Sequence, residues 1–511
     1  MYLEKKWFGV LSVFFLLIIS NVALASDDIK AVITTIAPDW SSSAFSIIPV
    51  NPPRTALNKL KPVDASDANI VAYGSYFFRF VRGSVEIIEK YSINDPQTLI
   101  WDYSTLESGH ATNVQDIVFA SINQAYMLRF MSSKVPILDL SGNDFQPGLS
   151  HLKTGELDLT SYADDDGSPE PVQGIIVGKK LFIVMQFIDR SGGWSNYIYN
   201  KPYLAVFDIE SNMEIDTGIE PGIKGIPLPV VNPASIQYIA DNNRLYLQAI
   251  GEYPSGDDPA KFTGGIIEID PTTYQIKMVL DDGDENDHPY GNITGMGIIS
   301  PTKGYFVAYA GWGDNNLYPF NPTTGEVSTP VSGLEHKNLS GMVSGIYLDN
   351  NRLFWLSNAT DARIEIIDPL TDTIVQSIST ELNPQRIVFC SSQLMGTITG
   401  KIESEGQGIP NVQVFIPETS ISAWTDELGM FKLINVPPGK HNLRVNASGY
   451  IPLVISNVEV VASANTELPV SSGRLLSLTS LLLMGDGNGD GCVDLKDVIL
   501  SLKIISTFNN Q

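Results

Sequence analysis

Residues 236–250 read IQYIADNNRLYLQAI, and residues 265–280 read GIIEIDPTTYQIKMVL. Apolar and polar side chains alternate in both stretches, and many are β-branched or aromatic, which is typical of half-buried strands. Asp-Asn-Asn divides the first stretch and Asp-Pro-Thr-Thr divides the second. Asp accepts backbone N–H bonds in turns and Pro presets the next φ. The pattern therefore predicts a unit of four short antiparallel strands.

The same unit recurs along the chain. Residues 343–358 (VSGIYLDNNRLFWLSN) and 362–378 (ARIEIIDPLTDTIVQSI) repeat both the strands and the turns. A four-stranded unit cannot bury both faces alone, so we expect the units to pack around an axis as propeller blades. Full blades are predicted near residues 69–105, 113–149, 172–218, 234–281, 292–330 and 340–380.

A further blade is expected from the two ends of this region. PQRIVFC (384–390) would pair with KAVITTI (30–36) and AFSIIPV (44–50). Such a pairing closes the ring and removes exposed sheet edges. The count is then seven, although the sequence leaves six or eight open. In this repeat, residues 26–390 resemble the seven-bladed propellers of exported bacterial surface proteins of the YVTN type, which implies an all-β propeller.

Residues 396–472 change in character. Alternating apolar residues predict strands around Val412–Ile416 and Phe431–Val436, with turns at Thr425–Gly429 and Pro437–Gly439. These motifs resemble a carboxypeptidase regulatory-like domain. The resemblance implies a small seven-stranded β-sandwich that serves as a spacer or adhesive module, without catalytic residues.

Residues 473–484 are interpreted as a linker to a calcium-binding segment at 485–511. Oxygen-bearing residues and one glycine match the register of a twelve-residue calcium loop, followed by the helical pattern VILSLKIIS. The expected Ca²⁺ ligands are Asp486, Asn488, Asp490, the backbone carbonyl of Cys492, Asp494 and Asp497. The segment resembles one repeat of a type I dockerin, an EF-hand-like half-dockerin. That implies docking to a cohesin, although a dockerin normally has two repeats.

The N-terminus reads as a secretion signal. Lys5 and Lys6 precede an apolar run, and Ala23-Leu24-Ala25 forms a cleavage site. We therefore expect residues 1–25 to be removed and the protein to be secreted, at the cell surface or in the periplasm, with no membrane span left. The net charge of -25 argues against nucleic acid as a partner. Cys390 and Cys492 are interpreted as free.

Four histidines, His110, His151, His288 and His336, fall in predicted connections between blades, near one rim of the channel. Histidine can bind metals or transfer protons, so His110, His288 and His336 are weak catalytic candidates. Histidine is also excluded from strands, which places it in loops by chance. The acidic stretches 162–167 and 281–287 are interpreted as solvated loops. Trp194 and Trp312, in hairpin loops, are candidates for stacking on sugar rings or on their own blade.

The predicted modules are interaction scaffolds, and no Ser-His-Asp elbow, phosphate loop or HExxH motif occurs. The sequence therefore favours an exported, non-enzymatic binding or cell-surface protein. The propeller would recognise a ligand or carbohydrate, and the calcium segment would be a docking tag. The alternative is a polysaccharide-degrading glycosidase or lyase with its active site on the channel rim.

Overall fold

The structure is a computed structural model. It describes residues 29–468 and 476–477, with gaps at 144–148, 194–196, 253–260, 312, 341–352, 392–394, 405, 418, 420, 448–449, 451 and 463. The described part consists of β-strands, turns and two short 3-10 helices, η1 (Leu149–His151) and η2 (Thr160–Tyr162). No helix within it is long and apolar enough to cross a membrane.

Residues 29–391 form seven main antiparallel sheets, which together are called the ring below. The first sheet contains β4 (Ala68–Tyr73), β5 (Tyr76–Val81), β6 (Ile87–Ser92) and β7 (Asp95–Ser104). The second contains β8 (Val114–Ser121), β9 (Gln124–Arg129), β10 (Lys134–Leu138) and β11 (Lys153–Asp158). The third contains β12 (Pro171–Val177), β13 (Lys180–Met185), β16 (Tyr203–Asp208) and β17 (Met213–Glu214). The fourth sheet contains β19 (Pro233–Ile239), β20 (Arg244–Ala249), β21 (Gly265–Ile269) and β22 (Ile276–Leu280). The fifth contains β23 (Asn292–Ser300), β24 (Lys303–Gly311) and β25 (Asp314–Phe320). The sixth contains β26 (Leu339–Ser340), β27 (Phe354–Asn358), β28 (Arg363–Asp368) and β29 (Thr373–Ser379). Short strands β14 (Ile188–Asp189), β15 (Ile198–Tyr199) and β18 (Ile226–Pro227) border the third sheet.

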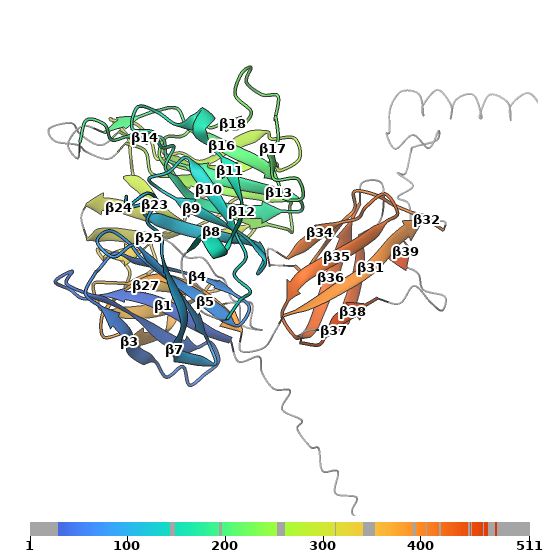
Figure 1. Ribbon diagram of the computed structural model, residues 1–511, viewed down its shortest axis with the longest axis horizontal. Coiled ribbons are helices and arrows are strands. Elements are labelled where there is room, and N and C mark those ends of the chain that lie inside the picture. The colour runs from blue at the N-terminus through green and yellow to red at the C-terminus, as the bar shows by residue number, and fades with distance from the viewer. Residues whose placement is uncertain are drawn as a thin grey trace, which may run out of the picture.

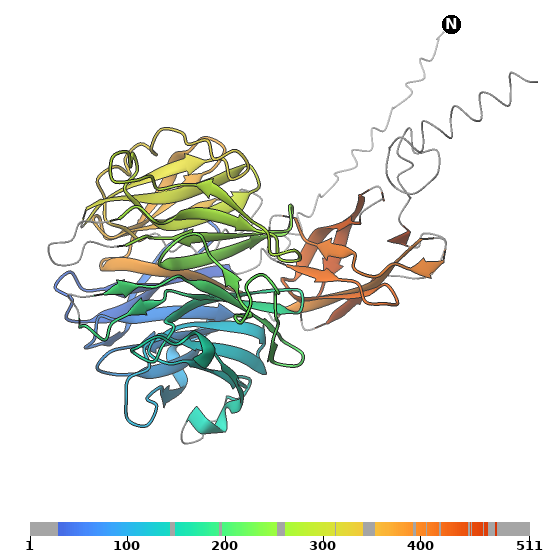
Figure 2. The ribbon, with the colours of Figure 1, turned by 90° about the horizontal axis from the view of Figure 1, so that it is seen from above.

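The seventh sheet joins the two ends of this region, as the sequence predicts. β1 (Ile29–Ile36) lies between β2 (Ser43–Pro49) and β30 (Asn383–Ser391), and β3 (Leu57–Val63) completes the sheet. Inner strands of successive sheets contact each other from β4 to β8, β12, β19 and β23, and β30 returns to β4. The sheets are thus arranged as the blades of a β-propeller (Figures 1 and 2).

Burial follows the position of each strand in its sheet. β21, a middle strand of the fourth sheet, is buried at four of five positions, whereas the outer strand β22 is buried only at Leu280. A middle strand is covered by the neighbouring sheets on both faces, so its residues form a nearly continuous apolar run. The turn chemistry also matches the prediction, because Asp270 Oδ1 accepts the backbone N–H groups of Thr272 and Thr273 at 2.8 and 3.0 Å.

Polar side chains on the inner strands bind the backbone of the next sheet. Four such bonds are Asn69 Nδ2 to Gln115 O (2.8 Å), Gly174 N to Asp116 Oδ2 (3.3 Å), Ile236 N to Gln173 Oε1 (2.8 Å) and Ile298 N to Gln237 Oε1 (2.7 Å). They satisfy backbone groups that the sheets leave unpaired near the axis. The channel is therefore lined by a polar belt that connects the first five sheets.

The ring has two different faces. First-to-second and third-to-fourth strand connections of each sheet lie at one end of its strands, which is called the turn face below. Connections between second and third strands, and between sheets, lie at the opposite end, which is called the loop face. This follows from the antiparallel order of the strands.

Residues 396–468 and 476–477 form a β-sandwich. One sheet contains β31 (Gly396–Ser404), β32 (Gln407–Gly408), β35 (Met430–Val436), β38 (Asn465–Glu467) and β39 (Leu476–Ser477). The other contains β33 (Gln413–Phe415), β34 (Ser422–Trp424), β36 (Gly439–Asn446) and β37 (Leu453–Val460). An apolar core that includes Ile398, Val414 and Leu433 lies between them. β39 falls in the segment predicted to be a linker, where it pairs with β31.

Candidate functional site

The structure places His110, His288 and His336 in exposed connections on the loop face, as predicted. His288 Nδ1 lies 2.9 Å from the backbone oxygen of Asp284, and its ring stacks on Phe262. His336 Nδ1 lies 2.8 Å from Asp314 Oδ1. Among the described residues, the three imidazoles belong to no group of ligand atoms that could share a metal ion.

The prediction for His151 is wrong. The second sheet does not end near residue 149, because its fourth strand is β11 (Lys153–Asp158). His151 ends η1, between the third and fourth strands, and therefore lies on the turn face. Only Leu157 of β11 is fully buried, so the strand lacks the strong apolar alternation on which the prediction depended.

Several predicted site residues lie outside the described part of the chain. These are the Ca²⁺ ligands Asp486, Asn488, Asp490, Cys492, Asp494 and Asp497, and the two loop tryptophans, Trp194 and Trp312. The predicted helix after the calcium loop lies there too. Cys390 is described, buried and free, and burial raises the pKa of its thiol.

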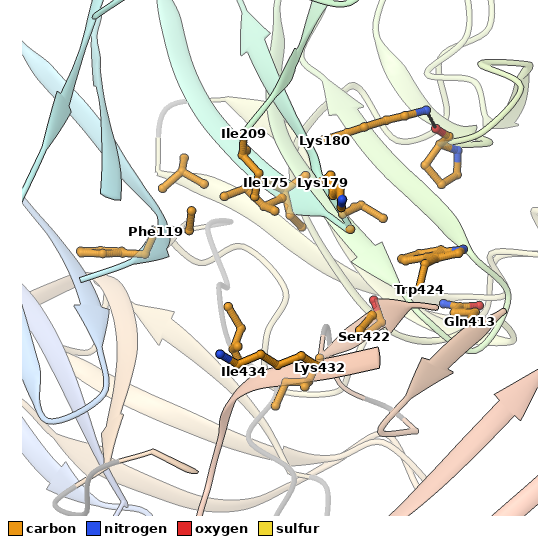
Figure 3. Close-up of a pocket in the computed structure, with 18 of the residues that line it drawn as sticks. Phe119, Ile175, Lys179, Lys180, Ile209, Gln413, Ser422, Trp424, Lys432 and Ile434 are labelled. Atoms are coloured by element: carbon orange, nitrogen blue, oxygen red, sulfur yellow. Dashed lines mark hydrogen bonds between the residues drawn. The ribbon is translucent and has the colours of Figure 1, made fainter. Parts of the chain in front are cut away.

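A large cleft lies between the turn face of the ring and the sandwich (Figure 3). Its volume is about 1740 Å³. The ring contributes residues of β4, β8, β12 and β30 together with the Gly178–Lys179 turn, and the sandwich contributes β34 and β35. Ligand sites commonly occur at such junctions between independently folded parts.

Apolar side chains line the cleft from both sides. Phe119 stacks on Tyr73 with ring centroids 4.8 Å apart, and both rings are half-buried. Ile434 lies across from Ile175 in Figure 3. Ile434 is 41% exposed, whereas most isoleucines in folded proteins are buried. The cleft therefore leaves apolar surface accessible to a ligand.

Charged groups surround this apolar surface. Lys179 pairs with Glu210 at 2.9 Å, and Lys180 donates to the hydroxyl of Tyr274 at 2.8 Å. Lys432 is exposed on β35, on the opposite side of the cleft (Figure 3). At the inner end, the Arg386 guanidinium pairs with the buried Asp116 at 3.1 Å. These groups provide hydrogen-bond donors around an apolar centre.

Specific contacts attach one edge of the sandwich to the ring. Gln413 Nε2 donates to the Tyr238 hydroxyl at 2.7 Å and to the Ala240 carbonyl at 3.3 Å. Burial raises the pKa of Tyr238, so its hydroxyl remains a neutral hydrogen-bonding group. Trp424 lies directly over Gly178, where an added Cβ would be only 3.1 Å from the indole. These contacts hold the sandwich over the cleft.

A separate acidic cluster lies on the loop face of the third sheet. Ligand oxygens of Asp164, Asp166 and Asp189 lie within 4.8 Å of one another, which is a spacing that could hold a cation. Burial, with Asp166 as the second cause, raises the pKa of the nearby Glu170 to about 9. Arg190 pairs with Asp166 and Glu170 at 3.0 and 3.2 Å.

The stretch 162–167 is solvated only in part: Asp165 and Gly167 are exposed, Asp164 and Asp166 are half-buried, and Tyr162 is buried. No local pattern connects Asp189 to the cluster, because β12 and β13 separate it from Asp164 in the sequence. In the second acidic stretch, 281–287, Asp282 is fully buried, whereas Asp284 and Asp287 are exposed.

Comparison with known families identifies the sandwich. Residues 396–471 match the family model of the carboxypeptidase regulatory-like domain. The chain therefore carries this domain, as its turn motifs predict. The match does not extend to the ring, and no curated protein matches the sequence.

Solved propellers resemble the ring in outline. Apo AztD from Citrobacter koseri is 12% identical with a TM-score of 0.42, and the alignment covers 71% of this chain and 98% of that one. A protein from Lactobacillus plantarum is 9% identical with a TM-score of 0.46, over 70% of this chain and 98% of that one. Similarity at this level carries no argument about function.

Proposed function

We propose that the protein is an exported, non-enzymatic binding protein whose ligand occupies the cleft between the ring and the sandwich. The observation that carries this proposal is the composition of the cleft. Its walls present accessible apolar surface on both sides, and fixed polar groups surround that surface. A concave site with an apolar lining and a few convergent polar groups is typical of ligand recognition.

The ligand class that suits this cleft best is carbohydrate. A sugar ring presents apolar C–H faces, which suit the Tyr73–Phe119 pair and Trp424. Its hydroxyl groups both donate and accept, and the side chains of Gln413 and Ser422 line the same cleft. A volume of about 1740 Å³ exceeds that of a typical single-ligand pocket, so an oligosaccharide is favoured over a monosaccharide.

The two ends of the sequence add export and docking to this proposal. We propose that residues 1–25 direct export and that the C-terminal loop binds Ca²⁺ and docks to a cohesin-bearing partner. A weak extracellular calcium site would suffice after export. Binding to a panel of cohesins with and without a chelator tests this part separately from the cleft.

A glycan panel tests the cleft itself. The mature chain is expected to bind one class of polysaccharide, and Lys432→Ala is expected to weaken that binding several-fold because it removes a donor at the cleft. Lys440→Ala is the matched control, since Lys440 is also an exposed lysine of the sandwich but does not line the cleft. If neither Lys432→Ala nor Lys440→Ala changed the affinity, the ligand would bind outside the cleft. Release of reducing or unsaturated ends would favour the polysaccharide-degrading alternative.

A further inference from the structure

A second, smaller concavity lies on the loop face of the ring, at the opposite end of the strands from the cleft. Its volume is about 490 Å³. It is called the fifth-sheet groove here, because β23, β24 and β25 supply most of it. The lining residues are Phe262, His288, Pro289, Tyr290, Gly291, Asn292, Ala308, Tyr309, Ala310, Gly311, Asn316 and Tyr318.

Aromatic rings dominate this lining. Phe262 and His288 stack with centroids 3.9 Å apart and planes within 9° of parallel. Tyr290 packs edge-on against Tyr318 at 5.2 Å. Four of the other lining residues are glycine or alanine (Gly291, Ala308, Ala310 and Gly311), whose small size leaves space beside the rings. A pocket of this size suits a small chemical group better than a polymer.

Carboxylates hold the two loops that carry the Phe262–His288 stack. The buried Asp282 accepts the backbone N–H of Gly264 at 3.1 Å, which fixes the end of the Phe262 loop. Asp284 Oδ1 accepts the N–H groups of Asn286 and Asp287 at 2.7 and 2.9 Å. The Asp284 carbonyl oxygen can only accept, so His288 donates to it from Nδ1. These bonds thus fix the position of the Phe262–His288 stack, which forms one wall of the groove.

Negative charge predominates around the groove, and Lys261, next to Phe262 in the sequence, pairs with Glu252 at 2.7 Å. Asp281, Asp284, Glu285 and Asp287 are exposed in the loop that leads to His288. On the other side, Asp314 lies two residues before the groove residue Asn316. Neither lysine nor arginine is among the described residues that line the groove. Negative charge around aromatic faces attracts a cation through both Coulomb and quadrupole interactions.

We propose that the fifth-sheet groove binds an organic ammonium cation, such as a quaternary ammonium group or the side chain of a lysine. The rings supply faces for the cation, and the surrounding carboxylates supply the opposite charge. A neutral sugar would gain nothing from the charge, and an anion would be repelled. This site is independent of the carbohydrate cleft, so either proposal can fail without the other.

Titration with choline and with its neutral carbon isostere, 3,3-dimethylbutan-1-ol, tests the proposal by calorimetry. Choline is expected to bind about tenfold more tightly, which corresponds to a partly desolvated cation–aromatic contact. A blocked lysine amide distinguishes a side-chain ligand from a small molecule, and binding of either cation supports the proposal. Methyl glucoside is titrated as a neutral sugar probe. Equal affinity for choline and the isostere would overturn the proposal. Binding of methyl glucoside alone, or of none of the probes, would also overturn it.

Two substitutions locate the site. His288→Leu removes one ring of the stack at an exposed position, so the fold should persist while choline affinity falls at least several-fold. His110→Leu is the matched control, because His110 is also an exposed histidine of the loop face and does not line the groove. A loss of similar size in both variants, or in neither, would exclude the groove as the binding site.

Discussion

The two faces of the ring differ in how their connections are built and in what they carry. On the turn face, two-residue connections such as Gly178–Lys179 leave little chain beyond the strands, and the sandwich packs there. On the loop face, longer connections carry His110, His288 and His336, the acidic cluster and the fifth-sheet groove. One repeated scaffold therefore contacts a second domain at one end and carries variable chemistry at the other.

The comparison extends to buried charges. Lys90 is fully buried near the turn face, and Asp282 is fully buried near the loop face. Neither forms an ion pair among the described residues; each is stabilised by backbone groups instead. On the turn face the charge connects two sheets, whereas on the loop face it shapes a loop. Three substitutions test these differences between the two faces of the ring.

Lys90→Ala is expected to have the largest effect. The ammonium group donates to the carbonyls of Leu140 and Gly142 at 2.7 and 2.9 Å and lies 4.2 Å from the centre of the Tyr76 ring. Its removal takes the lysine donor from the Leu140 carbonyl, whereas the Gly142 carbonyl keeps the Trp101 indole N–H at 2.9 Å, and it opens a cavity between two sheets. The free energy of unfolding of the ring should fall by about 3–4 kcal/mol, measured by chemical denaturation.

Lys277→Ala is the control, because Lys277 is an exposed lysine that also approaches a backbone carbonyl. It should cost less than about 0.5 kcal/mol. Burial lowers the pKa of Lys90 to about 8 from 10.5. Between these values the unfolded chain binds more protons, so wild-type stability should rise with pH relative to Lys90→Ala. If the stability difference between wild type and Lys90→Ala did not change with pH in this range, the pKa of Lys90 would not be lowered by burial.

Gly178→Ala should have a smaller effect, and it tests the attachment of the sandwich. Gly178 has a φ of +61° and contacts Trp424 where a Cβ would stand. Gly109 on the loop face has a φ of +82° but no atom within 4 Å of such a Cβ. Gly109→Ala should therefore cost only the backbone strain, about 1 kcal/mol, whereas Gly178→Ala should cost about 2 kcal/mol.

The difference between the two glycine variants isolates the contact with Trp424. Scattering in solution should show a more extended particle for Gly178→Ala and an unchanged one for Gly109→Ala. Equal losses of stability, with no change of shape in either variant, would mean that the Trp424 contact does not hold the sandwich in place.

Local patterns in the sequence predicted most of the fold. Asp-Asn-Asn and Asp-Pro-Thr-Thr specify turns through bonds within a few residues, so the repeat is readable without tertiary information. The pairing of β1 with β30 was also predictable, because an open ring would leave two exposed edges. β11 was missed, since only one of its residues is fully buried and the apolar alternation is correspondingly weak.

The candidate sites were less predictable because they depend on contacts between distant segments. The cleft exists because Gln413 meets Tyr238 and Trp424 meets Gly178, and neither pair shares a local pattern. Asp282 illustrates the same limit. In the sequence it is one of several acidic residues in 281–287, whereas the structure buries it alone among them.

Asp282→Asn is the smallest of the three changes and tests the loop face. Burial, with Asp281 as a further cause, raises the pKa of Asp282 from 3.8 to about 7. Between these values the folded protein holds a proton that the unfolded chain has lost. This contribution to stability is complete below pH 3.8 and disappears as the pH rises through about 7. The amide of asparagine cannot ionise, so the variant should lack this dependence.

The two pH profiles of stability should therefore converge. At pH 5, Asp282→Asn is expected to be less stable than wild type by about 1 kcal/mol, because the amide replaces a carboxyl group fitted to Gly264. Near pH 8 the difference should vanish or reverse, because the wild-type carboxylate is then charged and buried. Asp281→Asn, at an exposed neighbour, should instead follow wild type closely. Parallel profiles for Asp282→Asn and wild type would show that Asp282 is already ionised at pH 5, and that the loop carrying Phe262 tolerates a buried charge.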